Sequence, residues 1–219
     1  ENCTPIEVCN KYHAIHKSVY DWFDIEFDHF GRTSTEYQTR VAQDIFLKLH
    51  DNGLLKEQTL EQLYDPVLNK FLADRLVYGT CPMCGYEDAS GDQCDKCGQV
   101  YDARDLINPR SKLSDSTPVL KLTEHQYLDL PTLSPQIENW FQNSVATGFW
   151  TQIAQTTTNG WFKDGLKDRC ITRDLKWGTP VPLEKYAEKV FYVWFDAPIG
   201  YISITAAATD DWEKWWKNP

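Results

Sequence analysis

The sequence predicts an α/β protein that carries a small metal-binding segment, and three observations support this prediction. An unbroken apolar run, Val190–Phe195, is followed by Asp196, a turn at Ala197-Pro198 and an expected helix from about Tyr201. Strand, sharp turn and helix in this order are the unit of an open α/β sheet. Capping residues also mark two helix starts in the first forty residues, and two Cys-x-x-Cys pairs lie near the middle of the chain.

Length and charge exclude several classes of protein. The 219 residues are enough for one or two domains with a substantial core. A net charge of −10 argues against a general polyanion-binding surface, which needs a basic stripe. No run reaches the roughly 18 apolar residues of a membrane span, so we expect no membrane partner. The run from Val190 is interrupted by Asp196 and Pro198 and is expected in a core.

Two helices are predicted from their start signals. Thr4-Pro5-Ile6-Glu7 combines a capping threonine, a proline at the first helical position and a glutamate that completes a capping box. A second capping box at Thr35–Gln38 precedes an apolar face at helical spacing, and Gly53 is expected to end that helix. The apolar residues of that face are Val41, Ile45, Phe46 and Leu49.

The remaining elements are predicted from shorter patterns. The aromatic run 22–30 is expected to be extended, and residues 98–133 are expected to be irregular, with short strands at 119–122 and 127–130. Ser134-Pro135 predicts a further helix start, and Cys170–Thr172 a short strand. Because Val190–Phe195 is apolar on both faces, it is predicted to be a central parallel strand.

The cysteines indicate a metal site and a reducing compartment. Cys81, Cys84, Cys94 and Cys97 form two Cys-x-x-Cys knuckles separated by nine residues, each followed by a glycine. Four thiolates in this pattern predict one tetrahedral zinc ion, which is structural because no coordination position stays open. The alternatives are two unrelated pairs, a disulfide framework or an iron–sulfur cluster. The isolated Cys3, Cys9 and Cys170 are expected to be small buried apolar residues.

The segment after the apolar run is the candidate binding site. Trp194, Ala197, Pro198 and Tyr201 lie where ligands bind in open α/β sheets, beyond the C-terminal end of a strand. Two aromatic walls and a small floor suit a slim apolar side chain such as a thioether. The alternative is that Trp194 and Tyr201 are core residues, and the pattern alone favours this for Trp194.

Five blocks together resemble the methionyl-tRNA synthetase family, which belongs to the class I aminoacyl-tRNA synthetases. They are "FYVWFDAPIGY", "CITRDLKWGTPVP", "FLADRLVYGTCPMCG", "GDQCDKCG" and "YLDLP". The likeness runs from about Thr4 to Pro219. It implies a partial Rossmann-type catalytic domain with a connective insertion that contains the zinc knuckle. The implied domains are residues 1–51 and 171–219 of the catalytic domain and the insertion at 52–170, with the knuckle at 81–97.

The resemblance also implies chemistry. Members of the family activate methionine with ATP and Mg to methionyl-adenylate and transfer it to tRNA(Met) in the cytoplasm. The aromatic block lines the methionine pocket in the family, which implies this role for Trp194, Ala197, Pro198 and Tyr201. Arg173 matches an arginine near the active site, where it could stabilise phosphate or transition-state charge. The alternative for Arg173 is a salt bridge with Asp174 or another acid.

Departures from the family pattern are informative. The His-Ile-Gly-His and Lys-Met-Ser-Lys-Ser elements that bind ATP are missing, and His13-Ala14-Ile15-His16 is expected to be a surface pair. The chain therefore resembles a middle fragment of the catalytic domain, expected to be inactive alone. Some relatives carry a second knuckle. The matching positions here are Asp65, Leu68, Ser111 and Ser114, so one zinc is expected.

Two other functions remain open from the residues. A zinc-ribbon module that grips nucleic acid is disfavoured by the acidic charge and by Lys96 being the one basic residue between Cys81 and Cys97. A class I synthetase for leucine, isoleucine or valine would need a pocket for a branched aliphatic side chain.

Overall fold

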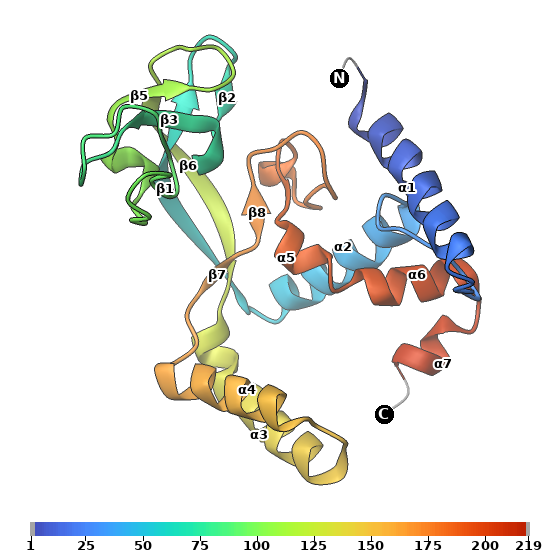
Figure 1. Cartoon of the computed structure of the whole chain (residues 1–219). Coiled ribbons are helices and arrows are strands. Elements are labelled where there is room, and N and C mark those ends of the chain that lie inside the picture. Colours follow the sequence, from blue (N-terminus) through green and yellow to red (C-terminus); the bar gives the residue numbers. More distant parts are fainter. Residues whose placement is uncertain (1–2, 218–219) are drawn as a thin grey trace. The chain divides into compact units, whose positions relative to one another are not determined.

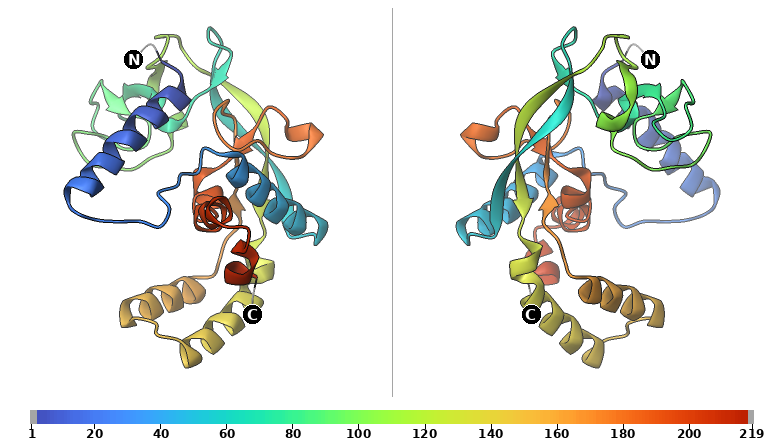
Figure 2. Two further views of the ribbon diagram at one scale, coloured as in Figure 1. Left: turned by 90° about the vertical axis from the view of Figure 1, so that its right-hand side faces the viewer. Right: turned by 90° about the vertical axis from the view of Figure 1, so that its left-hand side faces the viewer.

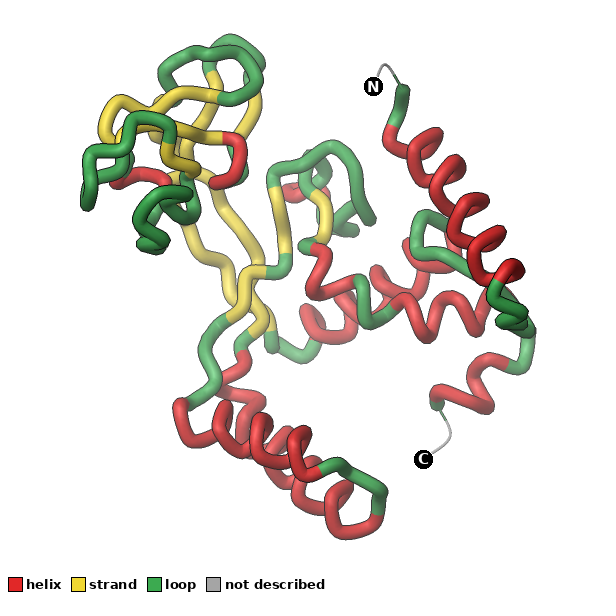
Figure 3. The backbone as a smooth tube through the Cα atoms, viewed as in Figure 1, coloured by secondary structure: helices red, strands yellow, loops and turns green. Residues whose placement is uncertain are grey.

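The computed structural model describes residues 3–217, and it contains two compact units (Figure 1). The smaller unit is Glu57–His125, and the larger combines Glu1–Lys56 with Gln126–Pro219. Residues 1–2 and 218–219, at the ends of the predicted first and third domains, lie outside the described residues. Helices predominate in the larger unit, and strands and loops in the smaller (Figure 3). The smaller unit lies within the predicted insertion at 52–170, whose borders remain a prediction.

The larger unit is built mainly from helices. Its helices are α1 (Pro5–Trp22), α2 (Glu36–Asp51), α3 (Leu130–Thr147), α4 (Gln152–Asp164), α5 (Val193–Asp196), α6 (Gly200–Ala208) and α7 (Trp212–Trp216), with a 3₁₀ turn at Glu184–Tyr186. Its short strands are β7 (Arg169–Cys170), β8 (Thr172–Arg173) and β9 (Val190–Phe191).

The first two helices begin where the sequence predicts. Thr4 caps α1, and its backbone and hydroxyl both contact the Glu7 carboxylate, which completes the capping box. The side chain of Thr35 accepts from the backbone N–H of Gln38 at 3.2 Å and caps α2. Gly53 follows α2 with φ of 66°, a left-handed conformation that glycine adopts without steric cost.

The core of the larger unit forms around α2. Its apolar stripe packs against β9 and the start of α6, and α2 lies along α6 (Figures 1 and 2). The Phe46 ring contacts the Phe191 ring at 5.1 Å between centroids. The buried members of this core are Val41, Ala42, Phe46, Ile171, Val181, Tyr186, Phe191 and Ile199. A helix of this length is only marginally stable by itself in water, so burial of this stripe is the main source of its stability in the protein.

The predicted strand Val190–Phe195 is wrong beyond Phe191. β9 has two residues and pairs antiparallel with β8 in a two-stranded sheet, with Thr172 opposite Phe191, so the prediction of a central parallel strand is also wrong. The N–H of Tyr192 still bonds Ile171 O at 2.8 Å, but the N–H of Ala197 bonds Val193 O, which closes a helical turn. A short apolar run fits a buried strand or a buried helix equally well, and its periodicity cannot distinguish them.

Other predicted boundaries also differ from the structure. α3 begins four residues before Ser134, because Asp129 caps it by accepting from Thr132 N–H at 3.1 Å. α3 and α4 form a helical hairpin (Figure 2), with Phe141 packed against Trp150 and Phe162. In the aromatic run 22–30, Trp22 ends α1 and residues 23–30 form a loop with no strand pairing. Cys3 is exposed, and Cys9 and Cys170 are half-buried, so none is the fully buried residue expected.

The smaller unit consists of antiparallel strands around a second core. Its strands are β1 (Leu55–Asp65), β2 (Lys70–Phe71), β3 (Val77–Thr80), β4 (Ala89–Ser90), β5 (Ile107–Ser111) and β6 (Val119–Leu128), with 3₁₀ turns at Asp74–Leu76 and Ala103–Asp105. One sheet has the order β2-β1-β6-β7. The first two residues of β1 and the last three of β6 belong to the larger unit, and there Tyr127 and Leu128 pair with β7. The other sheet has the order β4-β3-β5. Cys81 and Cys94 belong to the core between these elements.

Within residues 3–217, no helix combines the length and apolar composition that crossing a bilayer requires.

Candidate functional site

The four predicted metal ligands come together in the smaller unit. Each Cys-x-x-Cys segment is a tight turn in which the backbone N–H of the following glycine bonds the carbonyl of the first cysteine. These bonds are Gly85 to Cys81, 3.0 Å, and Gly98 to Cys94, 2.9 Å. Both glycines have positive φ, 73° and 72°, which explains why glycine stands at both positions.

The thiol geometry fits a zinc ion. All four Sγ atoms lie within 4.8 Å of one another. Cys81 and Cys97 are 3.9 Å apart, and Cys84 and Cys94 3.7 Å, measured between sulfurs. A tetrahedron with zinc–sulfur bonds of about 2.3 Å has edges of about 3.8 Å. Among the described residues, this is the one group of three or more His, Cys, Asp or Glu side chains that could share a metal ion.

A second pair of turns in this unit has the same backbone shape without thiols. Asp65–Leu68 and Ser111–Ser114 are followed by Asn69 and Asp115, which have φ of 49° and 57°. Asp65 Oδ1 accepts from the N–H of Val67 at 2.9 Å, and Ser111 Oγ accepts from the N–H of Leu113 at 3.2 Å. These positions are the predicted counterparts of a second knuckle.

A buried carboxylate occupies the centre of this second pair. Asp65 is fully buried and accepts hydrogen bonds from the hydroxyls of Ser114 and Ser116. Burial raises the pKa of Asp65, but the hydrogen bonds from Ser114, Ser111, Leu68 and Ser116 outweigh this effect and hold that pKa well below its ordinary value. Hydrogen bonds therefore hold the two turns of this second pair together. In the first pair, the four thiols occupy the corresponding positions.

The predicted pocket residues lie on a bend between two helices. We call residues 193–201 the α5–α6 elbow. On it, Trp194 is 75% exposed and Tyr201 72% exposed, and Val193 is also exposed. Phe195 points the other way, with its ring 5.0 Å from that of Phe191. The alternative that Trp194 and Tyr201 are core residues is therefore wrong, and their role in a pocket remains a prediction.

A buried polar network holds the elbow from behind. The amide of Gln38 in α2 donates to the main-chain oxygen of Asp196 at 2.6 Å, and its oxygen accepts from the Ser203 hydroxyl at 2.5 Å. The Thr179 hydroxyl donates to the Asp196 carboxylate at 2.8 Å. Burial raises the pKa of Asp196, although the hydrogen bonds from Thr179 and Gln38 oppose that effect.

Sequence reasoning placed Gln38 in a capping box with Thr35, but its side chain bonds Asp196 O and Ser203 Oγ instead, and this role was missed. The signal was available, because Gln38 occupies the same helical face as Val41, Ala42 and Phe46, where an apolar side chain is expected. A polar residue on the buried stripe of a helix needs hydrogen-bond partners inside the protein.

The start of α6 also approaches the loop before α2 closely. A Cβ on Gly200 would lie 2.7 Å from Thr33 Cγ2, and one on Gly31 would lie 2.7 Å from Ile204 Cγ2. Both distances are shorter than side-chain carbons adopt, so a Cβ at either position would force the Thr33 or Ile204 side chain to shift. The elbow is therefore fixed against the 31–35 loop as well as against α2.

Arg173 lies on β8 and has polar and aromatic partners. Its Nη1 donates to Thr172 O at 2.8 Å and to Cys170 Sγ at 3.0 Å, and its guanidinium lies 3.7 Å from the centroid of the Tyr192 ring. Asp174 pairs with Lys189, and both side chains are largely buried. The expected alternative, an ion pair between Arg173 and Asp174, is therefore not the arrangement found.

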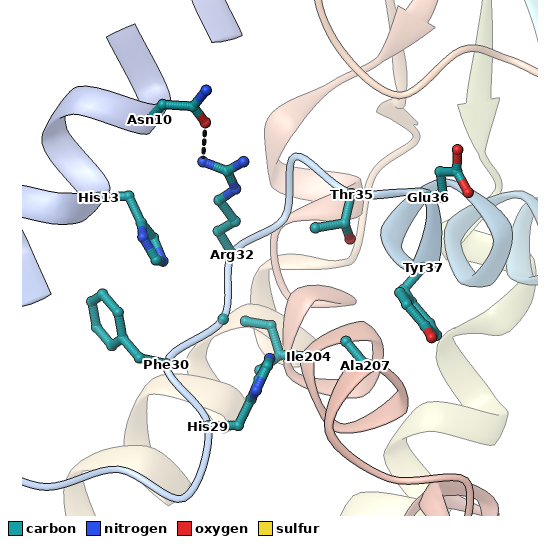
Figure 4. A pocket seen from close by; sticks show the side chains of 11 residues that line it. Asn10, His13, His29, Phe30, Arg32, Thr35, Glu36, Tyr37, Ile204 and Ala207 are labelled. Atoms are coloured by element: carbon teal, nitrogen blue, oxygen red, sulfur yellow. Dashed lines mark hydrogen bonds between the residues drawn. The ribbon is translucent and has the colours of Figure 1, made fainter. Parts of the chain in front are cut away.

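A hollow of about 620 Å³ lies between α1, the 29–35 loop and α6 (Figure 4). Arg32 reaches across it to donate to Asn10 at 2.6 Å. His13 packs against Phe30 with 4.7 Å between ring centroids and is half-buried, while His16 is exposed. The expectation of a surface pair is therefore confirmed for His16 but not for His13. The predicted residues Trp194 and Tyr201 do not line this hollow.

Comparison with known proteins decides the family. A family model described as "tRNA synthetases class I (M)" matches residues 1–219. The chain belongs to this family. Methionine–tRNA ligases named as cytoplasmic are 58% identical in Arabidopsis thaliana, 57% in Saccharomyces cerevisiae and 55% in Homo sapiens, each over 100% of this chain. The chain spans 28%, 29% and 24% of those relatives.

Solved structures agree with the fold of this synthetase chain. The Mycobacterium tuberculosis methionyl-tRNA synthetase in complex with methionyl-adenylate aligns with a TM-score of 0.62 over 98% of this chain and 38% of the other, at 12% identity. The ligand-free form of that enzyme aligns with a TM-score of 0.61 over 99% of this chain and 39% of the other, at 13% identity. The mixed α/β class is thereby confirmed. Neither the zinc-ribbon module nor the synthetase for a branched amino acid is favoured.

Proposed function

We propose that this chain is part of a methionine–tRNA ligase that acts in the cytoplasm. The observation that carries the proposal is the identity of 55–58% to proteins of that name over the whole chain. The reaction would join the methionine carboxylate to the α-phosphorus of ATP with release of pyrophosphate, aided by Mg. A terminal hydroxyl of tRNA(Met) would then take the methionyl group and release AMP.

The α5–α6 elbow would supply part of the methionine side-chain site. Trp194 and Tyr201 are large aromatic residues left exposed a few residues apart, and such exposure is typical of a binding surface rather than of a core. Ala197 and Pro198 between them have small side chains, which leave room for a slim ligand. A thioether makes favourable contacts with ring edges at about 5 Å, which suits methionine.

The four-cysteine site would hold one structural zinc ion. The fit rests on the sulfur spacing and on the two glycine-ended turns described above. When bound, zinc would stabilise the fold of the smaller unit, because its four ligands come from two turns that are separate in the sequence. Four thiolates leave no coordination position for a substrate, so no catalytic step is assigned to this metal.

Arg173 would act on charge near the adenylate. A guanidinium has five N–H donors in a planar fork, which can serve a protein contact and a phosphate together. The bonds of Arg173 to Thr172 O and Cys170 Sγ leave donors on the other guanidinium nitrogens. ATP and tRNA(Met) would be partners of the longer protein that contains this chain.

Amino-acid-dependent exchange between ATP and pyrophosphate tests the proposal. The longer protein should catalyse exchange with methionine and much less with leucine, isoleucine or valine. The isolated chain should catalyse none, since it lacks the two ATP-binding signatures. Exchange that depends on leucine instead, or exchange by the isolated chain, would contradict the proposal. A filter-binding titration of the isolated chain with generic RNA at moderate salt separates the zinc-ribbon alternative, which requires binding.

A further inference from the structure

We propose that Gln38 is a positioning residue for amino-acid recognition: its carboxamide fixes the α5–α6 elbow in the arrangement that presents Trp194 and Tyr201. The catalytic consequence of this inference rests on the proposed function. The geometric part does not, since it depends only on contacts within the larger unit.

Gln38 joins three helices at one point. It lies in the first turn of α2 and is fully buried. Its Nε2 donates to Asp196 O, at the C-terminal end of α5, and its Oε1 accepts from Ser203 Oγ in α6. These partners are 158 and 165 residues away in the sequence. A single planar group thus sets the distance and direction between the two helices of the elbow.

The hydrogen bond from Gln38 gives the main-chain carbonyl of Asp196 a donor that the short helix α5 cannot provide. The last four carbonyls of any helix lack intrahelical partners, and α5 has only four residues. A buried carbonyl without a donor is costly, so the position of Asp196 depends on an external N–H. Gln38 supplies that donor.

Glutamine is the side chain that this geometry requires. An amide offers donors and an acceptor on one planar group, whereas a glutamate would lack the donor for Asp196 O and a leucine would lack both. Ser203, itself buried, donates to this acceptor at 2.5 Å and to Gly200 O at 3.2 Å. Substitution of Gln38 by leucine would therefore remove the donor that Asp196 O accepts from and the shorter of the two hydrogen bonds of Ser203.

Further contacts restrict the same segment. Thr179 holds the Asp196 carboxylate, and Gly200 touches Thr33, as described above. Positions of groups that contact a substrate matter to within about 0.5 Å. A shift of Asp196 O is transmitted directly to Ala197 and Pro198, the next residues in the chain and the predicted floor of the methionine site.

The test compares Gln38→Leu and Ser203→Ala in the longer synthetase with Gln142→Leu, a matched control in α3. Gln142 is exposed and its side chain bonds only weakly, to Asn159 at 3.5 Å. The KM values for methionine and for ATP are measured by pyrophosphate exchange. The preference for methionine over norleucine, in which a methylene replaces the sulfur, is measured in the same assay.

The expected result is a KM for methionine raised about tenfold or more in Gln38→Leu, since losing the bonds to half-buried Asp196 and buried Ser203 costs that much. The KM for ATP should change less than twofold, and the preference over norleucine should fall. Ser203→Ala should show the same pattern to a smaller degree. Because both residues share one bond, the double variant should be no worse than Gln38→Leu.

A KM for methionine that stays normal in both variants would overturn the inference. So would an equal rise in the KM values for methionine and ATP, which indicates general damage. If Gln38→Leu does not fold, Ser203→Ala decides by the same criteria.

Hydrogen exchange of the backbone separates this inference from the proposed function. Amides of residues 197–208 should exchange faster in the isolated chain carrying Ser203→Ala than in the wild type, while those of α3 stay unchanged. Unchanged exchange would overturn the inference that the bond between Gln38 and Ser203 fixes the α5–α6 elbow. Faster exchange with a wild-type longer protein that does not use methionine would overturn only the proposed function.

Discussion

Gly200 and Thr33 lie so close that a Cβ on Gly200 would be 2.7 Å from Thr33 Cγ2. This contact places the first residue of α6 directly against the loop that precedes α2. It explains why a glycine stands two residues after Pro198, although the backbone angles of Gly200 are open to any residue.

Gly200→Ala should therefore destabilise the larger unit. Overpacking of this kind costs about 1–3 kcal/mol in the free energy of unfolding. Urea denaturation followed by circular dichroism measures it. Gly160→Ala in α4 is the matched control: no atom lies within 4 Å of the added Cβ, and alanine should stabilise that helix by about 0.5–1 kcal/mol. Equal effects at the two glycines would refute the close approach.

Trp194→Ala should weaken the use of methionine by the longer protein. The loss of a large aromatic contact corresponds to about 1–3 kcal/mol, or roughly a 5- to 150-fold fall in kcat/KM for methionine. The KM for ATP should hardly change. Trp161→Ala is the control, because that ring is 61% exposed but belongs to α4. An unchanged kcat/KM in Trp194→Ala would remove this residue from the site.

Removal of one thiol should remove the metal. Elemental analysis of the purified chain should find one zinc per chain, and Cys84→Ser should contain far less. Chelation of zinc from the wild type should also lower the thermal stability of the smaller unit. Cys170→Ser, which lies outside the cluster, should keep its zinc. Full zinc content in Cys84→Ser would contradict the four-thiolate site.

Asp65 should contribute stability that depends on pH. Its folded-state pKa lies below the unfolded value of about 3.9, so the contribution is complete above that pH and is lost as the pH falls further toward the folded pKa. Asp65→Asn should lower the urea midpoint of the smaller unit at pH 7 and flatten its dependence on pH below about 4. Asp88→Asn, an exposed carboxylate in the same unit, is the control. If the urea midpoint depended on pH in the same way in both variants, the charge of Asp65 and its hydrogen bonds from the serine hydroxyls would not stabilise the smaller unit as predicted.

Some elements could be predicted because their signals are local. The capping threonines of α1 and α2, the glycine after α2 and the two cysteine pairs each act within a few residues, and the structure confirms them. The single-zinc expectation also gains a physical basis, since Asp65 and its serine partners occupy the second pair of turns.

Other elements could not be predicted because their stability comes from distant partners. β1 and β6 are long but carry many polar residues, and only pairing between the strands makes such sequences extended. The apolar pattern predicts Val193–Phe195, the start of the elbow, as part of a strand, whereas helical hydrogen bonds and Gln38 determine its shape. The partners of Gln38 lie more than 150 residues away in the sequence, so no local pattern could predict them.

A crystal structure of the longer protein with methionine bound tests the central claim most directly. The account predicts the methionine sulfur between the Trp194 and Tyr201 rings, about 5 Å from each, with Ala197 and Pro198 beneath it. Methionine bound elsewhere, or both rings covered by other parts of the polypeptide with no space between them, would contradict the account.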